Sequence, residues 1–300
     1  MTRAVVFAYH NVGVRCLKAL LAQGIDVALV VTHEDNPNET IWFDSVARTA
    51  AEYDIPVITP EEANTPELLA RLEAIRPDFL FSFYYRQMLK PVLLATATRG
   101  AYNMHGSLLP KYRGRVPINW AVLHGETETG ATLHQMVEKP DAGEIVAQQA
   151  VPILPDDTAR EVFDKVVLAA EMCLLGVLPR LTLGTAPHTP MDLKQGSYFG
   201  GRNAEDGRID WTQSAQAIHN LVRAVAPPYP GAFCDTSAGP LRLLRTIRAN
   251  NAPDSNGLFA MGDSIFVRCG DGKCLCVLDA ELNGRPLMAS ELEKQTISLG

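Results

Sequence analysis

The sequence lacks a membrane-spanning run, a secretion signal and the paired cysteines of a zinc site. No run approaches 18 uninterrupted apolar residues, so no transmembrane helix is predicted. The apolar run at 4–8 is too short for a signal peptide, and no cleavage site follows it. The six cysteines are scattered and form no CxxC pair, which favours reduced thiols in a reducing compartment. We therefore expect a cytoplasmic protein that does not engage a membrane.

Positive charge is also scarce. The 300 residues include 27 Lys and Arg against 34 Asp and Glu, a formal net charge of −7. Such a chain gains little from the phosphate backbone of nucleic acid, so we expect no nucleic-acid partner. Apolar residues make up 47% and charged residues 20%, as in a globular protein of one large or two ordinary domains.

Three common functional motifs are missing. The first predicted turn, YHNVGVRC, lacks the GxGxxG spacing with which a dinucleotide fold approaches a pyrophosphate. A GxSxG nucleophile elbow is absent, which disfavours an α/β-hydrolase. The seven histidines show no HExxH or comparable spacing, so we expect no metal.

The first hundred residues alternate short apolar strands with helical patterns. This alternation predicts βαβ units and a Rossmann-like, doubly wound α/β fold with a mostly parallel sheet. The expected strands are 4–9, 25–32, 55–58 and 78–84, and the expected helices are 14–21, 41–53 and 61–75.

The remaining residues predict the end of this domain and then a second one. We expect strands at 100–105, 131–137 and 145–151, and helices at 118–123, 156–183 and 214–225. Short β-like runs at 231–235, 241–248, 257–260, 264–268 and 274–280 predict a small OB-like β-barrel. The Gly- and Pro-rich stretch 184–203 is typical of a connection. The predicted division is a catalytic domain at 1–190, a linker at 191–203 and the barrel at 204–300.

Candidate catalytic groups follow the strand at 100–105. Asn103 and His105 are two residues apart and point the same way on an extended backbone, and Asp141 lies in the later turn PDAG. Asn is a neutral donor suited to the oxyanion of acyl transfer, and His moves protons near neutral pH. A carboxylate beside the imidazole favours the imidazolium. From the residues alone, a hydrolase pair of Ser107 with His105 and a purely structural role both stay open.

A resemblance narrows these alternatives. The string NMHGSLLPKYRGRVPINWAVLHGETETGATLHQM, with the DAG turn after it, resembles the signature of the folate-dependent formyltransferase family. VVFAYHNVG, THEDNP, FSFYYRQML and NLVRAVAPPYPGAF are similar to the formyltransferase part of the bifunctional polymyxin-resistance enzymes, the ArnA family. The bifunctional relatives carry a further domain beyond the point matching Gly300, and the sequence leaves open whether this chain is standalone or excised.

The resemblance implies that the chain transfers a formyl group from 10-formyltetrahydrofolate, its co-substrate, directly to an amine. Asn103 would stabilise the oxyanion, His105 would carry the proton and Asp141 would support His105. The residues implied in folate binding are Gln87, Met88, Leu89, Arg115, Val137, Glu138, Lys139, Pro140 and Asp141.

The acceptor implied by the ArnA resemblance is the 4-amino group of UDP-4-amino-4-deoxy-L-arabinose, in lipid A modification and polymyxin resistance. A basic cluster at 111–115 suits phosphate, and the substrate-binding candidates are His10, Arg113 and Arg202. The alternatives are a methionyl-tRNA formyltransferase and a 10-formyltetrahydrofolate hydrolase or folate-binding protein. Residues 204–300 hold 9 Arg and Lys against 11 Asp and Glu, which favours the nucleotide sugar over tRNA. The sequence does not indicate an oligomeric state.

Overall fold

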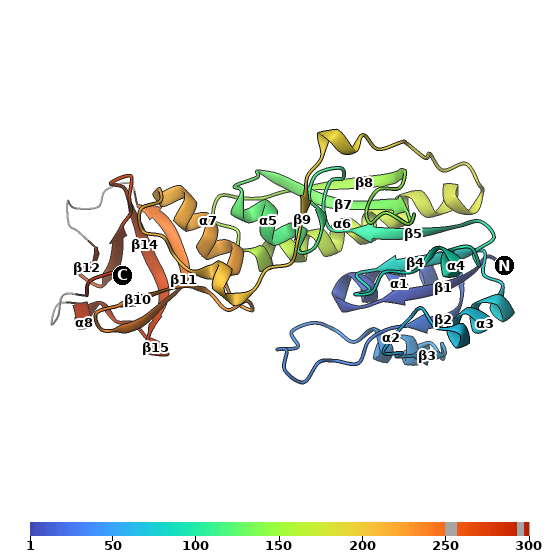
Figure 1. Cartoon of the computed structure of the whole chain (residues 1–300), viewed down its shortest axis with the longest axis horizontal. Helices are drawn as coiled ribbons and strands as arrows, with labels where there is room; N and C mark the ends of the chain where they lie inside the picture. Colours follow the sequence, from blue (N-terminus) through green and yellow to red (C-terminus); the bar gives the residue numbers. More distant parts are fainter. Residues whose placement is uncertain (250–256, 293–296, 300) are drawn as a thin grey trace. The chain divides into compact units, whose positions relative to one another are not determined.

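The computed structural model describes residues 1–249, 257–292 and 297–299, and the chain divides into two compact units (Figure 1). The first unit comprises 1–117, 128–151 and 164–199, and the second comprises 118–127, 152–163 and 200–300. Each unit therefore combines segments that are distant in sequence.

A seven-stranded sheet forms the centre of the first unit, with the order β3-β2-β1-β4-β5-β7-β8. The strands from β3 to β5 are parallel, and β7 pairs antiparallel with β5. Most side chains of the central strands β1, β2 and β4 are buried and apolar, many of them Val or Phe, as expected for a sheet covered on both faces. The strands are β1 (Arg3–Ala8), β2 (Asp26–Val31), β3 (Val57–Ile58), β4 (Phe79–Phe83), β5 (Gly100–His105), β7 (Glu128–Gln135) and β8 (Ile145–Pro152).

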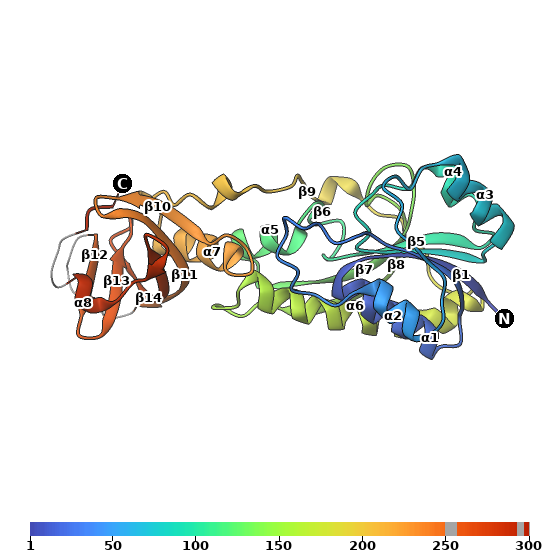
Figure 2. The ribbon, with the colours of Figure 1, turned by 90° about the horizontal axis from the view of Figure 1, so that it is seen from below.

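Helices cover both faces of this sheet, which confirms the doubly wound α/β fold. In Figure 2, α1, α2 and α6 lie on one face and α3 and α4 on the other. Gly24, with φ of 74°, ends the first helical segment as predicted. The helices are α1 (His10–Ala22), α2 (Val46–Glu52), α3 (Pro66–Ile75), α4 (Pro91–Leu94), α5 (Pro117–Leu123) and α6 (Ala159–Thr182).

The helix predicted at 41–53 is wrong over its first five residues. Ser45 caps α2 by accepting a hydrogen bond from the Arg48 amide at 3.2 Å, so the helix begins only at Val46. Residues 32–45 instead form a loop in which Trp42 and Phe43 pack on other aromatic rings. Tertiary packing has overridden local helix propensity there.

The stretch predicted as a plain connection has structure of its own. Thr189 bridges to Ile145, a 3₁₀ turn covers Leu193–Gln195, and β9 (Tyr198–Phe199) pairs in parallel with β6 (Arg113–Gly114). Residues 198–199 thus hold the loop that follows β5.

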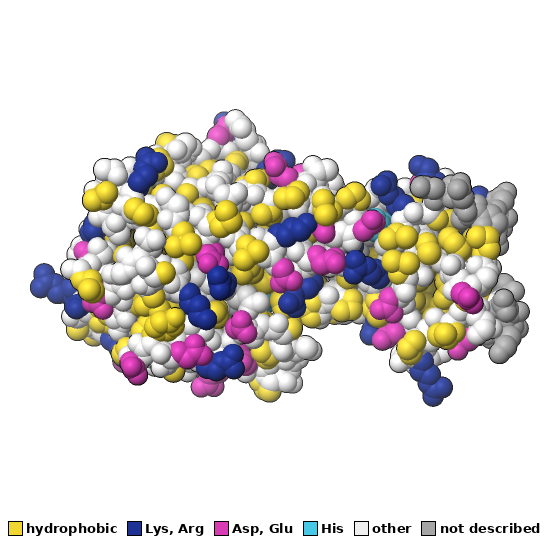
Figure 3. All heavy atoms as spheres, turned by 180° about the vertical axis from the view of Figure 1, so that it is seen from behind, with side chains coloured by type: hydrophobic (Ala, Val, Ile, Leu, Met, Phe, Trp, Pro, Cys, Tyr) yellow, Lys and Arg dark blue, Asp and Glu magenta, His cyan; other side chains and the backbone are white. Residues whose placement is uncertain are grey.

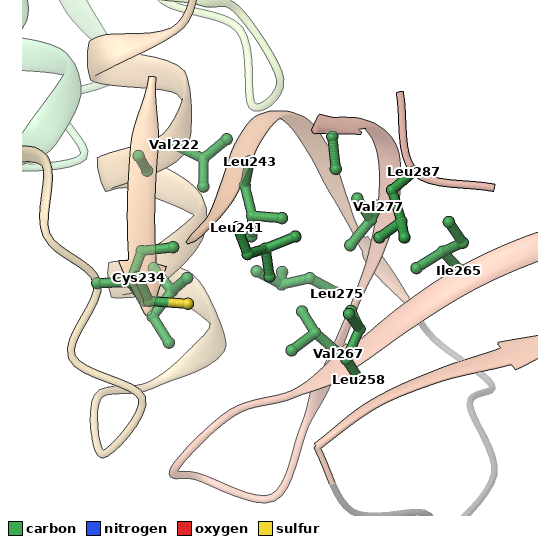
Figure 4. Packing of buried hydrophobic residues seen from close by; sticks show 14 of the residues in the cluster. Val222, Cys234, Leu241, Leu243, Leu258, Ile265, Val267, Leu275, Val277 and Leu287 are labelled. Atoms are coloured by element: carbon green, nitrogen blue, oxygen red, sulfur yellow. The ribbon is translucent and has the colours of Figure 1, made fainter. Parts of the chain in front are cut away.

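The second unit is built on an antiparallel sheet with the order β10-β11-β14-β13-β12. Residues 297–299 form isolated bridges with β10 and with β12, the two edges, which closes the sheet as a small barrel. Alternate apolar side chains fill its interior, among them Leu243, Val267 and Leu275 (Figure 4). The elements are η2 (Ala204–Gly207), α7 (Ala215–Val225), β10 (Ala232–Thr236), β11 (Gly239–Ala249), β12 (Leu258–Met261), β13 (Ser264–Arg268), β14 (Cys274–Leu282), β15 (Arg285–Pro286) and α8 (Ala289–Leu292).

Helix α7 joins the distant segments of the second unit. Asn119 Nδ2 donates to the Ala224 carbonyl at 2.8 Å, and His219 Nε2 lies 3.0 Å from the Pro155 carbonyl. Arg223 is 5% exposed and donates to the carbonyls of Val122 and Asp157. The second unit is therefore held together by hydrogen bonds from all three of its segments.

Candidate active site

Strands β5 and β7 place an amide beside an imidazole. The antiparallel register pairs Asn103 with His134, and Asn103 Nδ2 lies 3.1 Å from His134 Nε2. His134 Nδ1 lies 2.9 Å from the Gln135 carbonyl and donates to it. The Nε2 of a neutral His134 therefore accepts a hydrogen bond from Asn103. An amide nitrogen has two hydrogens, so Asn103 keeps a second donor for an incoming oxygen.

Asp141 joins this pair to His105. Its Oδ1 lies 3.5 Å from His105 Nδ1 and 3.5 Å from His134 Nε2, and its Oδ2 accepts a hydrogen bond from the Gly114 amide at 2.9 Å. Asp141 has φ of 48°, a left-handed conformation that Asp tolerates better than most residues. The structure thus brings Asn103, His105 and Asp141 into one cluster.

Burial sets the charge state of His105. Desolvation lowers the pKa of His105, which is 7% exposed, although the Asp141 carboxylate and the hydrogen bond to the Tyr112 carbonyl act in the opposite direction. Nε2 lies 2.7 Å from the Tyr112 oxygen and donates to it. The Asp141 carboxylate thus favours the imidazolium form of His105, as expected, but burial acts against it and the balance lowers the pKa of His105.

Asp141 itself is ionised. Burial alone would raise the pKa of Asp141, but the facing His105, the contact with His134 and the Gly114 amide hold that pKa well below its usual range. The Gly114 amide donates to Asp141 Oδ2 at 2.9 Å, and this hydrogen bond favours the charged carboxylate. The site therefore combines a carboxylate with a neutral imidazole that is ready to accept a proton.

The loop after β5 is fixed by its own hydrogen bonds. Ser107 is fully buried, and its Oγ donates to the Lys111 carbonyl at 2.7 Å. Thr132 Oγ1 donates to the Ser107 carbonyl at 2.6 Å and accepts from the Leu109 amide at 3.1 Å. These bonds give Ser107 a role in shaping the loop, and they speak against a nucleophilic Ser107–His105 pair.

The residues predicted for folate lie on two segments of the first unit. Gln87 bonds to the Glu61 carbonyl and the Ala63 amide, Met88 is 55% exposed, and Leu89 is buried in the core. The second segment, 137–141, is the loop that carries the Asp141 carboxylate, and its residues Val137, Glu138 and Lys139 are exposed. Met88 and Val137 are exposed apolar side chains, of the kind that an apolar ligand would cover.

The cationic candidates differ in their surroundings. Arg113 is buried, its guanidinium lies 6.0 Å from the centre of the Tyr198 ring, and its Nε finds no hydrogen-bond partner among the described residues. Arg115 is exposed. Arg202 belongs to the second unit, where its guanidinium lies 4.7 Å from the centre of the Trp120 ring and donates to the Asp206 carbonyl. His10 opens α1 with a φ of 65°.

Within the described ranges, with 250–256, 293–296 and 300 set aside, no group of His, Cys, Asp and Glu is arranged to hold a metal ion. In the same part of the chain, no helix is long and apolar enough to cross a bilayer.

Comparison with family models matches both parts of the chain. Residues 2–178 match the model described as formyl transferase, and residues 202–295 match the formyl transferase C-terminal domain. The chain belongs to the formyl transferase family. Strand β5, the loop after it and the turn that holds Asp141 all lie inside the first match.

Solved structures share the fold of this formyl transferase. An N-formyltransferase from Helicobacter canadensis, in complex with folinic acid and dTDP-3-aminofucose, has a TM-score of 0.71 and 21% identity, covering 92% of this chain and 99% of its own. The sugar 3N-formyl transferase WlaRD, with dTDP and 5-N-formyl-tetrahydrofolate, has a TM-score of 0.72 and 21% identity. The match covers 92% of this chain and 97% of WlaRD. A 4-N formyltransferase from Francisella tularensis has a TM-score of 0.63 and 18% identity. The match covers 77% of this chain and 91% of that enzyme.

Sequence reasoning missed His134. This residue is 2% exposed, contacts both Asn103 and Asp141, and completes the cluster. Its only sequence signal is its position on an apolar strand, which also fits a core histidine. The antiparallel register of β7 on β5 brings it to Asn103, and that register is not visible in the sequence.

Proposed function

We propose that this formyl transferase moves the formyl group of 10-formyltetrahydrofolate to the 4-amino group of UDP-4-amino-4-deoxy-L-arabinose. The observation that carries the proposal is the buried cluster of Asn103, His105, His134 and Asp141. It offers an oxyanion donor and a proton carrier, and the Ser107 hydroxyl is occupied by its hydrogen bond within the loop. Such a site suits direct attack by an amine that the substrate brings itself.

The proposed reaction has two steps that share one proton. The neutral acceptor amine attacks the formyl carbon, a C–N bond forms, and Asn103 stabilises the resulting oxyanion. His105 and Asp141 take the proton from the attacking nitrogen and return it to N10 of the folate as the old C–N bond breaks. The products are the formamide and tetrahydrofolate. A His105 that is neutral beforehand fits the first proton transfer.

We place the folate along 87–89, Arg115 and 137–141, and the phosphates of the acceptor near Arg113. The exposed apolar side chains of Met88 and Val137 support the first placement, and the buried, incompletely bonded guanidinium of Arg113 supports the second. The neighbours crystallised with folates and with dTDP or a dTDP-amino sugar are consistent with both ligand classes. Arg202, a further sugar-nucleotide candidate, is part of the same proposal.

Charge favours a nucleotide sugar over tRNA. Residues 204–300 carry a net charge of about −2 by sequence. On the face shown in Figure 3, Lys and Arg side chains lie among Asp and Glu side chains rather than in a continuous basic band. On the ArnA resemblance, we extend the proposal to a cytoplasmic role in lipid A modification and polymyxin resistance. The proposed domain division is a catalytic domain at 1–190, a linker at 191–203 and a barrel at 204–300.

The deciding experiment is a mass-spectrometric screen of acceptors with 10-formyltetrahydrofolate. The expected result is one added formyl group on UDP-4-amino-4-deoxy-L-arabinose, and a slower or absent reaction with dTDP-amino sugars. Formylation of charged initiator tRNA alone would replace the proposal with the tRNA enzyme. Release of formate without any formylated amine would replace it with a hydrolase.

The catalytic cluster is tested by substitution. His105→Ala and Asp141→Ala should each lower kcat at least about a hundredfold while the folded state persists. Ser107→Ala is the matched control, since it removes a neighbouring hydroxyl that takes no part in the proposed chemistry, and it should lower kcat less than about tenfold. Near-normal turnover in both cluster variants would contradict the mechanism, and abolished turnover in Ser107→Ala alone would point to a serine nucleophile.

A further inference from the structure

Aromatic residues gather where β1 and β4 end. Tyr9 and His10 follow β1, and Tyr84 follows β4, its parallel neighbour. The carboxyl ends of parallel strands are where open α/β sheets bind ligands. His10 and Tyr84 both have left-handed backbones, with φ of 65° and 59°. For residues other than glycine this conformation costs energy, and such strain is concentrated at functional sites.

The loop between β2 and α2 adds two more rings. The centre of the Trp42 ring lies 4.5 Å from that of His10, and Phe43 lies 3.9 Å from His10 at a 30° tilt. Both residues are only partly buried. We call Trp42, Phe43, His10 and Tyr84 the aromatic shelf.

Polar contacts fix this loop against the strand ends. Tyr9 Oη donates to Asp35 at 2.7 Å, and the Arg86 guanidinium binds both oxygens of Glu39 at 2.8 Å. The Asp44 amide donates to Asn11 at 2.8 Å. A loop held at three points presents its rings in a fixed arrangement, which is what a selective binding surface needs.

The shelf reaches the reaction centre. A Cβ placed on Gly106 would lie 2.0 Å from Tyr84 Oη, so the tyrosine hydroxyl lies against the backbone directly after His105. Tyr84 and His10 are neighbours, with ring centres 6.5 Å apart. The rings therefore continue outward from the catalytic cluster, on the same unit of the chain.

Chemistry selects the part of the substrate that fits there. A pyranose has a face of C–H groups, and the negative face of an aromatic ring attracts such groups as well as the amine's cationic form. The loop also carries four acidic side chains, and Arg86 forms an ion pair with one of them, Glu39. The four are Glu34, Asp35, Glu39 and Asp44. An anionic diphosphate is disfavoured beside these carboxylates, whereas sugar hydroxyls are suitable partners for them.

We propose that the aromatic shelf binds the pyranose ring of the acceptor and that Trp42 contributes most of its contact surface. The assignment rests on the proposed function, since it assumes an amino sugar as the acceptor. It makes Trp42 a specificity residue for the sugar, separate from the groups that hold the folate or the nucleotide.

The test compares KM and kcat in Trp42→Ala with those of the wild type. The KM for the amino-sugar nucleotide should rise about fivefold to tenfold. The kcat should change less than about threefold and the KM for the folate should stay constant. Trp42→Phe should restore most of the affinity, and Trp42→Leu, which keeps apolar volume without the ring, should not. Tyr53→Ala, which removes an aromatic side chain that is 52% exposed, serves as the matched control and should match the wild type.

A second measurement separates sugar from nucleotide. The inhibition constant of the free nucleoside diphosphate should be equal in the wild type and in Trp42→Ala. If this inhibition constant rises together with the KM, the nucleotide lies on the shelf and the proposal is overturned. A raised KM for folate or an unchanged KM for the acceptor would also overturn it. Absence of turnover with any amino sugar in the wild type would instead refute the proposed function. If Trp42→Ala does not fold, the Phe and Leu pair decides.

Discussion

His105 shows how burial and a neighbouring charge compete at a single side chain. The Asp141 carboxylate raises the pKa of His105, but loss of solvent lowers it by more. Since Nε2 already donates to Tyr112, the ring nitrogen that faces Asp141 is the one that exchanges the proton. In the proposed mechanism, His105 therefore begins as a proton acceptor, and Asp141 stabilises the charged form that follows.

This balance predicts the titration of His105. Its midpoint should lie below about 6.5, the ordinary value, because the folded state disfavours the proton. Asp141→Asn should move the midpoint lower still, because it removes a group that raises the pKa of His105. NMR of histidine-labelled protein measures both, with His105→Gln identifying the signal. A midpoint above the ordinary value, or a rise in the Asp141→Asn variant, would contradict the assignment.

At the scale of elements, the cluster joins two strands to one turn. Strand β5 supplies Asn103 and His105, and β7 supplies His134. The turn after β7 supplies Asp141. The turn after β7 is closed at Gly143, where a Cβ would lie 1.9 Å from the Gln135 carbonyl oxygen. Asp141 stands two residues earlier on the same turn. The position of the carboxylate therefore depends on a close backbone approach that only glycine allows.

Gly143→Ala should consequently lower kcat by about a hundredfold, since small displacements of a catalytic group have effects of that size. The matched control is Gly176→Ala in α6, where a Cβ meets nothing within 4 Å. That change should leave kcat unaltered and stabilise the protein by about 0.5–1 kcal/mol. Steady-state kinetics and thermal melting test both variants. Equal kinetics in the two variants would show that the turn adapts.

Helix α7 offers a second prediction. Arg223→Ala should destabilise the second unit by about 2–4 kcal/mol, because it removes a buried guanidinium that donates to the carbonyls of Val122 and Asp157 and to the Asn220 side chain. Arg242→Ala, at an exposed pair with Glu281, should cost less than about 0.5 kcal/mol. Urea unfolding measures the difference. A small effect at both positions would mean that water replaces the guanidinium.

The sequence predicts elements better than it predicts contacts. The sequence located β5 to the residue and the start of α7 to within one residue, whereas α6 begins at Ala159 and not at the predicted 156. His134 was missed because its role depends on which strand pairs with β5. The helix predicted at 41–53 began too early because rings distant in sequence draw Trp42 and Phe43 into a loop. The local sequence pattern indicates burial and secondary-structure propensity. The contacts of His134 and the start of α2 depend instead on residues that are distant in sequence.

At the scale of the whole molecule, the two units are interleaved along the chain. The second unit takes 118–127 and 152–163 from between segments of the first. Asn119 and Pro155 on those segments are bonded to α7, as described above. Neither unit can be obtained by a single cut.

A site-specific nick therefore should not separate the pieces. If a protease site is inserted between Gly200 and Gly201, which are both exposed, the folded and cleaved protein should elute as one species in gel filtration. Denaturant should release two fragments. A fragment 1–199 expressed alone should aggregate, because Ala121, Val122 and Phe163, buried in the intact chain, lose their covering. Separation of the nicked protein without denaturant would contradict the interleaved architecture.

The same interleaving determines the order in which the protein is completed on the ribosome. Residues 118–127 leave the exit tunnel long before α7, and at ordinary rates of translation the delay is roughly 5–20 s. Throughout that interval Asn119 and the Val122 carbonyl lack the hydrogen-bond partners that α7 supplies. Nascent chains halted within this window would present this segment incomplete, and they are the form of this protein on which a chaperone would act.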